Sequence, residues 1–342
     1  MTDINKAISD NEIKNGRSIV KTSINDVSAL ISSNIKTINI SDIQSKYETK
    51  FDDTKYYGNS GETIKDQFVA IAFGSDKVAS SSNGIIWTEY DLPATRNWTG
   101  VEYGANLLVA CAYNSRYGAE STAIDTWTEN NFSTQKNWQS IFYGQDKFIV
   151  LADSTTTSVY STNDNSWALS NLPASATWRC GAYGSSTYVA LAYGSAVFAT
   201  STNGISWTQR SLPSSDNWNS IVYGDKFVAI AYNSNKVIYS ENGVDWNETT
   251  LPRNQFWTSI SYGNGKYIAV ASGSSNIAVS SDGINWSEYS IPYGDWKRIS
   301  YGNGLYLAIT NGTLVITSTN GTSWTQRSIS NRNWYDLVST YN

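Results

Sequence analysis

Residues 257–289 read WTSISYGNGKYIAVASGSSNIAVSSDGINWSEY and hold four short, alternating or β-branched segments separated by turn signals. The first segment begins at Trp257 and ends at the Gly-Asn-Gly turn of residues 263–265, and the fourth contains Trp286 and follows the Ser-Asp-Gly turn of residues 281–283. Turns of this kind between such segments predict β-hairpins. Four short antiparallel strands in one repeat are typical of a β-propeller blade.

The same unit recurs along the 342-residue chain, and its tryptophans mark the repeat. All 14 fall into two registers whose steps are 38 to 40 residues, and each member of the second register follows its mate by 10 or 11 residues. The first register holds Trp87, Trp127, Trp167, Trp207, Trp246, Trp286 and Trp324. The second holds Trp98, Trp138, Trp178, Trp218, Trp257, Trp296 and Trp334. A period of about 40 residues fits a four-stranded propeller blade.

The two ends of the repeat region are incomplete in complementary ways. The first Tyr-Gly turn, at residues 57–58, has no tryptophan before it, and the segment that starts at Trp334 has no blade after it. We therefore expect a strand near Leu337 to pair with the sheet that contains Phe68, which would close the ring and remove free sheet edges. The predicted fold is all-β: a seven-bladed β-propeller of four-stranded antiparallel blades over residues 58–342, closed by the C-terminal strand.

Residues 1–57 differ from the repeats, since they contain no tryptophan and one glycine. Apolar residues follow one another by seven, four, three, four and seven positions at Ile13, Val20, Ile24, Val27, Ile31 and Ile38. This spacing predicts a short N-terminal helical arm, either a coiled-coil seam that forms an oligomer such as a homotrimer, or an amphipathic helix docked on a second helix or on a partner. So short an arm cannot bury itself, which favours an attachment or oligomerisation role.

The turn before each tryptophan of the first register carries a motif. It reads Ser-Thr-Asn-Gly-Ile-Ser-Trp at residues 201–207 and Ser-Ser-Asp-Gly-Ile-Asn-Trp at residues 280–286, whereas residues 121–127 lack both the Asn/Asp and the Gly, and Asp164 replaces the Gly in a third copy. The motif resembles the Asp-box (BNR) turn of sialidase-like propellers, with one residue missing before the Gly. That resemblance implies a structural role: Ser and Asn/Asp bond the turn backbone, Gly has positive φ and Trp packs between sheets.

Trp-x-x-Ile-x-Tyr-Gly and Ser-x-Asn-Gly-x-x-Trp in tandem are similar to propellers of phage and prophage tail proteins. Residues 12–20 and 40–44 resemble a helical module of tail and fibre proteins from phages of Gram-positive bacteria. The resemblance implies a virion tail protein made in the host cytoplasm, with residues 1–57 bound to other virion or tail proteins and the propeller bound to a bacterial surface polysaccharide. The alternatives are a structural or decorating virion propeller without a ligand, and a bacterial sugar-binding lectin.

Differences among the repeats indicate where a ligand would bind. The first-to-second and third-to-fourth turns are nearly constant, whereas the other two connections, on the opposite face of a meander blade, vary strongly. Variable loops on a constant scaffold are how many binding surfaces are organised, and planar polar groups beside aromatic rings suit sugars. The candidate ligand-binding residues are Arg116, Tyr117, Arg96, Arg253, Tyr293 and Asp295.

Composition bears on the remaining function classes. The chain contains no histidine, which removes the usual base and metal ligand, and the Arg-Ile-Pro start of sialidases is missing. We therefore predict no enzyme, no catalytic residues, no metal and no cofactor. A net charge of −5 disfavours a nucleic-acid partner. The sequence has no apolar run that would predict a membrane span and no leader-like start that would predict a signal peptide. Cys111 and Cys180 lie in repeats that are not neighbours, which favours two buried thiols over a disulfide.

Overall fold

The computed structural model describes residues 64, 66–161 and 166–341, all within the unit Gly61–Asn342. The predicted helical arm of residues 1–57, with its coiled-coil alternative and its homotrimer, lies outside the described residues. The described residues form strands and no helix, and so no helix long and apolar enough to cross a membrane.

The strands have the following bounds. The first eleven are β1 (Phe68–Ser81), β2 (Thr88–Gly104), β3 (Leu107–Tyr113), β4 (Ser115–Ala123), β5 (Thr126–Lys136), β6 (Trp138–Gly144), β7 (Lys147–Ala152), β8 (Thr155–Ser161), β9 (Trp167–Ala176), β10 (Trp178–Gly184) and β11 (Thr187–Ser201). The others are β12 (Thr208–Tyr223), β13 (Phe227–Ser240), β14 (Asn247–Gly263), β15 (Lys266–Ser272), β16 (Ser274–Ser280), β17 (Ser287–Gly294), β18 (Trp296–Gly302), β19 (Leu305–Thr310), β20 (Leu314–Ser318), β21 (Thr325–Ser328) and β22 (Trp334–Ser339).

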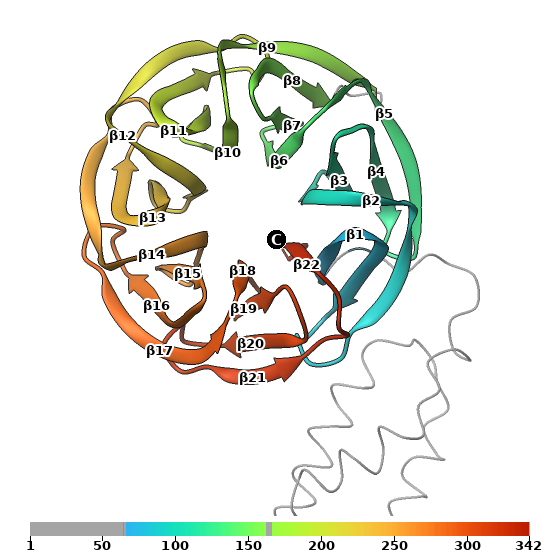
Figure 1. Cartoon of the computed structure of the whole chain (residues 1–342), viewed down its shortest axis with the longest axis vertical. Helices are drawn as coiled ribbons and strands as arrows, with labels where there is room; N and C mark the ends of the chain where they lie inside the picture. The colour runs from blue at the N-terminus through green and yellow to red at the C-terminus, as the bar shows by residue number, and fades with distance from the viewer. Residues whose placement is uncertain (1–63, 65, 162–165, 342) are drawn as a thin grey trace, which may run out of the picture. The chain divides into compact units, whose positions relative to one another are not determined.

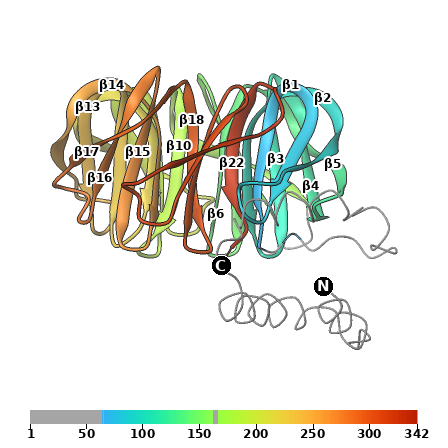
Figure 2. The same cartoon turned by 90° about the horizontal axis from the view of Figure 1, so that it is seen from below.

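The strands form antiparallel sheets that stand around a central axis (Figure 1). Two sheets have four strands each, β6 to β9 and β18 to β21, and two are larger, with six and eight strands. The larger sheets contain long strands that change partner along their length: β2 pairs with β1 up to Asn97 and with β3 from Asn97 onward. Strands β6, β10, β18 and β22 lie nearest the axis and run along it (Figures 1 and 2). The architecture is that of an all-β propeller.

The C-terminal strand pairs with the first strand of the described unit. In the antiparallel pair β1–β22, Phe68 lies opposite Ser339 and Ala70 lies opposite Leu337. The predicted contact between the segment near Leu337 and the sheet of Phe68 is therefore confirmed. Because β22 occupies the inner edge of this sheet, the two ends of the ring are held by backbone hydrogen bonds.

The hydrophobic core lies between neighbouring sheets rather than at the axis. One cluster joins Val189 and Leu191 of β11 to Trp218 of β12 and Phe227 of β13, and six further clusters repeat this pattern. All seven tryptophans of the second register are 0 to 1% exposed. They are interblade packing groups, since full burial of a large ring is the main favourable term in such a contact.

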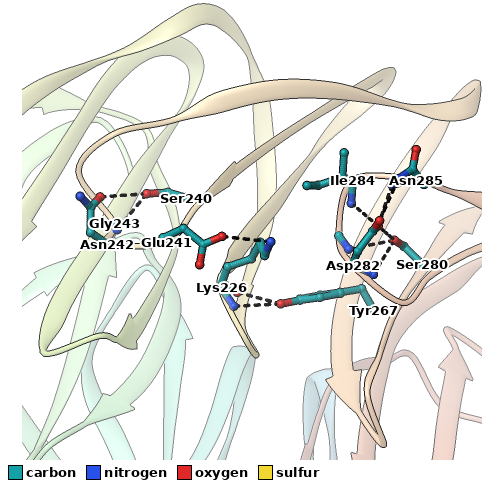
Figure 3. Close-up of polar contacts among 11 residues, drawn as sticks. Lys226, Ser240, Glu241, Asn242, Gly243, Tyr267, Ser280, Asp282, Ile284 and Asn285 are labelled. Atoms are coloured by element: carbon teal, nitrogen blue, oxygen red, sulfur yellow. Dashed lines mark hydrogen bonds and ion pairs between the residues drawn. The ribbon is translucent and has the colours of Figure 1, made fainter.

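In five of the turns before the tryptophans of the first register, the serine and the Asn or Asp form the hydrogen bonds that the sequence implied. In the turn of Asp282, the hydroxyl of Ser280 accepts from the amide of Gly283, and Oδ1 of Asp282 accepts from the amides of Ile284 and Asn285 (Figure 3). Gly283 has φ of +73°, and a Cβ there would lie 2.7 Å from a methyl carbon of Val228 in the preceding unit. The turn therefore fixes both its own shape and its contact with the preceding unit.

The described Tyr-Gly pairs lie at hairpin turns, as predicted, and their glycines have a second role. In five units the tyrosine of the following unit lies directly on the glycine, and at Gly302 the residues Ser339 and Tyr341 take this place. A Cβ on Gly104 would lie 2.2 Å from Cγ of Tyr143, and one on Gly184 would lie 2.0 Å from Cγ of Tyr223. These glycines let the inner strands approach one another closely, which is a packing requirement rather than a requirement for positive φ.

Candidate functional site

Three of the predicted ligand-binding residues lie together, Arg96 in β2 and Arg116 and Tyr117 at the start of β4. The guanidinium carbon of Arg96 is 5.0 Å from the centre of the Tyr117 ring, and that of Arg116 is 5.7 Å from it. Arg116 is exposed, whereas Arg96 and Tyr117 are half-buried. The arrangement is a tyrosine ring flanked by two cations, which stiffens the ring and leaves the Arg116 guanidinium in solvent.

Arg96 and Arg253 also have carboxylate partners. Nη2 of Arg96 lies 2.5 Å from Oε2 of Glu129, and Nη2 of Arg253 lies 2.5 Å from Oε2 of Glu288. Arg332 makes the equivalent pair with Glu89 in another connector. A repeated pair of this kind fastens the connector to the outer strand of its unit. Such partly exposed pairs add little stability each, but they hold the arginine side chain in place.

Tyr293 and Asp295 lie apart from Arg96, Arg116 and Tyr117, at the end of β17 and in the connection from β17 to β18. The hydroxyl of Ser272 is 3.3 Å from Oδ1 of Asp295, and Tyr293 is 72% exposed. Phe256, which lies opposite Ser272 in the β14–β15 pair, is 47% exposed. We call Phe256, Tyr293 and Asp295 the loop patch. It presents two accessible aromatic rings and one carboxylate on the variable connections.

Sequence analysis did not single out Phe256, although a large apolar residue in a variable loop is itself a signal. It missed a second feature as well. Along the axis a cavity of about 310 Å³ is lined by the inner strands, and its charged residues are Glu102, Arg179, Arg298 and Asp336. Hydroxyl groups of Ser140, Ser220, Ser259, Ser261, Ser300 and Ser339 line the rest of its polar wall.

A β-bulge in every inner strand determines which side chains face this axial cavity. In β10 the register shifts between Trp178 and Cys180, and the same shift follows the tryptophan in each other inner strand. A bulge re-aims the residues around it. The residues just after the tryptophan therefore reach across to the neighbouring inner strand: the hydroxyl of Thr99 donates to the carbonyl of Trp138, and that of Thr258 to the carbonyl of Trp296.

One carboxylate completes this ring of contacts where the chain ends meet. Asp336 of β22 accepts from Nε of Arg298 at 2.5 Å through Oδ1, and from the backbone amide of Val101 at 2.9 Å through Oδ2. Elsewhere in the ring a serine takes the same place, since the hydroxyl of Ser220 accepts from the amide of Ile260. Asp336 is 8% exposed, so these charge-assisted bonds form largely away from water.

Two titratable groups of the axial cavity are held in their neutral form. Burial raises the pKa of Glu102 to about 8, partly opposed by the amide of Tyr103 that donates to its carboxyl and assisted by the negative charge of Asp336. Burial likewise raises the pKa of the Cys180 thiol to about 12. Cys111 and Cys180 are both buried and free, which confirms the predicted thiols. Neither thiol is an activated nucleophile at neutral pH.

Arg179 is the remaining charge in the axial cavity, and its partners are neutral. Nε donates to Oδ1 of Asn219 at 3.1 Å, Nη1 donates to Oε1 of Gln139 at 2.7 Å, and the guanidinium carbon lies 6.0 Å from the ring centre of Tyr193. Among the described residues, Arg179 has no carboxylate within ion-pair distance. After this tryptophan the other repeats carry Thr, Gln, Asn, Tyr or, at Lys297, a second cation, so the sequence does not single out Arg179.

No protein-family model matches the chain, and no curated protein matches it in sequence. Among solved structures it is similar to virginiamycin B lyase from Staphylococcus aureus, at 14% identity and a TM-score of 0.64, over 73% of this chain and 94% of the lyase. YCF48 from Cyanidioschyzon merolae is 14% identical with a TM-score of 0.57, over 72% of this chain and 90% of YCF48. A 6-phosphogluconolactonase candidate from Bacteroides uniformis is 10% identical with a TM-score of 0.65, over 80% and 99%. At these identities the likeness shows the fold alone.

The comparison corrects one sequence-based conclusion. We predicted that the chain is not an enzyme, but the similar propellers include a lyase and a lactonase candidate, so that prediction is wrong as an inference from fold and composition. The absence of histidine only restricts which groups could carry a reaction in this chain. Within residues 64, 66–161 and 166–341, no three Cys, Asp or Glu side chains are grouped to hold a metal ion.

Proposed function

We propose that this chain is a virion tail or fibre protein whose propeller binds a bacterial cell-surface glycan during host attachment. In this proposal residues 1–57 join the chain to other tail proteins, as a homotrimer, and the protein is made in the host cytoplasm. The tandem turn motifs and the N-terminal segment support the virion role through their resemblance to tail proteins. The observation that carries the binding role is the loop patch.

The loop patch suits a carbohydrate for a physical reason. Sugar rings present apolar C–H faces that stack on aromatic side chains, while their hydroxyls bond to carboxylates and amides. Tyr293 and Phe256 are 72% and 47% exposed, the two most exposed aromatic rings among the described residues. Asp295 and Ser272 lie beside them, and their hydrogen bond of 3.3 Å positions the carboxylate. Tyr117 with Arg116 is a second surface of similar chemistry.

We also infer that the propeller has seven blades. The count is supported by the strand registers, because the long strands change partner where one four-stranded unit gives way to the next. Strands β1, β11 and β13 each supply two successive strands of a unit on either side of a register shift. The seven units are β22-β1-β2, β2-β3-β4-β5, β6-β7-β8-β9, β10-β11-β12, β12-β13-β14, β14-β15-β16-β17 and β18-β19-β20-β21.

Binding of the full chain to purified bacterial cell-wall polysaccharides on a glycan array tests the binding role. The variant Phe256→Ala/Tyr293→Ala is expected to lose at least about tenfold in affinity, because each stacked ring contributes about 1 kcal/mol or more. Tyr289→Ala is the matched control, since Tyr289 lies on the same strand as Tyr293 and is 38% exposed but belongs to the outer strand segment. Equal loss in the control, or no binding by the wild-type chain to any envelope polysaccharide, would reject the loop patch as a glycan site.

The virion role has its own test. Deletion of residues 1–57 is expected to leave the circular dichroism spectrum of the strands unchanged and to abolish incorporation into tail particles. Particles that still contain the truncated chain would show that attachment does not depend on this segment.

A further inference from the structure

The axial cavity contains one positive charge, on Arg179, that forms no ion pair with any carboxylate of the described residues. Of its four charged residues, Arg298 and Asp336 pair with each other at 2.5 Å. Glu102 remains, but it forms no ion pair with Arg179, and burial keeps the Glu102 carboxyl protonated at neutral pH. A guanidinium bonded only to neutral groups in a partly desolvated cavity is stabilised when an anion joins it.

The side chain of Arg179 is also held in a fixed orientation. Its Nη1 donates a hydrogen bond to Gln139 and its Nε donates one to Asn219, on the inner strands on either side. These two residues are 9% and 8% exposed. Asn219 is itself fixed, because its amide nitrogen donates to the carbonyls of Trp257 and Thr258. Nη2 forms no hydrogen bond with any described residue and is available to a ligand. An arginine already held by two buried amides loses little conformational entropy when it binds.

The rest of the cavity wall restricts the class of anion. Serine hydroxyls from several inner strands line it, and Glu102 in its protonated form adds a donor. These groups match a ligand that carries hydroxyls besides its charge. A volume of about 310 Å³ lies at the small end of ligand pockets, which hold roughly 300 to 1,000 Å³. This volume suits a molecule of about the size of one monosaccharide.

We infer that the axial cavity is a binding site for a small hydroxylated carboxylate, a sugar acid, whose carboxylate is held by Arg179 and whose hydroxyls meet the serines of the inner strands. This site is distinct from the loop patch and does not depend on the proposed glycan-binding role. Arg179 is the residue that fixes the charge of the ligand. Gln139 and Asn219 are positioning residues that act through it.

Calorimetric titration of the full chain with D-glucuronate, D-glucose and inorganic phosphate tests the inference. We expect glucuronate to bind, glucose to bind at least about tenfold more weakly, and Arg179→Gln to weaken glucuronate binding at least about tenfold while leaving the melting temperature nearly unchanged. Arg179→Lys keeps the positive charge without the planar guanidinium, so its affinity for glucuronate should lie between that of the wild-type chain and that of Arg179→Gln. The matched control is Lys297→Gln, because Lys297 follows its tryptophan as Arg179 does but does not line the cavity.

Each other outcome overturns the inference in a defined way. No heat with glucuronate up to about 10 mM would reject the site, since binding weaker than this has no specificity to explain. Equal binding of glucose would reject the role of Arg179, and equal or tighter binding of phosphate would reject the sugar-acid class. Equal loss in Lys297→Gln would show a general charge effect. The variant Phe256→Ala/Tyr293→Ala should bind glucuronate normally, so failure of the loop-patch proposal and failure of this one are distinguishable.

Discussion

The substitution Gly184→Ala tests the close contact between inner strands. An ideal Cβ on Gly184 would lie 2.0 Å from Cγ of Tyr223, whereas ordinary van der Waals contact begins at 3.4 Å, so the ring or the strand must move by about 1.4 Å. The ring cannot move freely, because its other neighbour is Phe227 at 4.7 Å between ring centres. Overpacking of this kind costs about 1 to 3 kcal/mol, offset by up to about 1 kcal/mol from the lower entropy of the unfolded chain. We expect a net loss of about 1 to 2 kcal/mol.

Urea unfolding measures this loss as a lower midpoint at unchanged slope, with a fall in melting temperature of roughly 2 to 4 °C per kcal/mol. Gly312→Ala is the matched control, since the nearest atom to its Cβ is 4.0 Å away, and it should be neutral. In the background Tyr223→Ala the ring is absent, so adding Gly184→Ala should cost nothing further. A wild-type-like midpoint for Gly184→Ala, or the same loss with and without the Tyr223 ring, would refute the contact as the reason for the glycine.

Three further predictions follow from single side chains. Asp282→Ala should lose about 1 kcal/mol of stability at pH 7, and Asp282→Asn should lose almost none. Backbone amides hold the pKa of Asp282 below its usual 3.8, so the wild-type chain should lose stability relative to Asp282→Asn only as the pH falls below about 4. Urea unfolding at pH 3 and pH 7 measures this difference. Asp336→Ala should lower stability by about 2 to 3 kcal/mol in thermal unfolding, because it leaves the partly buried guanidinium of Arg298 without its carboxylate partner. Because the pKa of Glu102 rises from 4.5 to about 8 on folding, wild type should lose stability relative to Glu102→Gln as pH rises between these values, and a pH-independent difference would contradict this.

The sequence predicted the propeller because its strongest signal is also its main packing group. The tryptophans of the second register are buried between sheets, so their spacing along the chain reports directly on the spacing of blades. Ring closure could be predicted for a similar reason: the segment near Leu337 lacked a partner, and the sheet of Phe68 lacked an inner strand. The pairing of Ala70 with Leu337 confirms it.

The axial cavity could not be predicted in the same way. Period-two alternation assigns the faces of a regular strand, but the bulge after each tryptophan interrupts that alternation. Arg179, Gln139 and Asn219 are 40 residues apart in sequence, so nothing local shows that they meet. Likewise, the Tyr-Gly pair is a normal turn signal, and only the neighbouring strand explains why Gly184 must be glycine.

In a ring of similar units, a feature that recurs is more readily explained by the ring than by a ligand. Arg96 and Arg332 lie two residues before their tryptophans and Arg253 lies four before its own, and each pairs with a glutamate at one equivalent position of the outer strand, so holding the connectors accounts for Arg96 and Arg253 without a ligand. Arg179 is the opposite case, because the amides on either side of it supply geometry but no charge. A cation that has no carboxylate partner among the described residues favours binding of an anion from outside. Repetition therefore favours the axis over these two connector arginines as a ligand site, and glucuronate binding by Arg179→Gln as tight as binding by the wild-type chain would refute this.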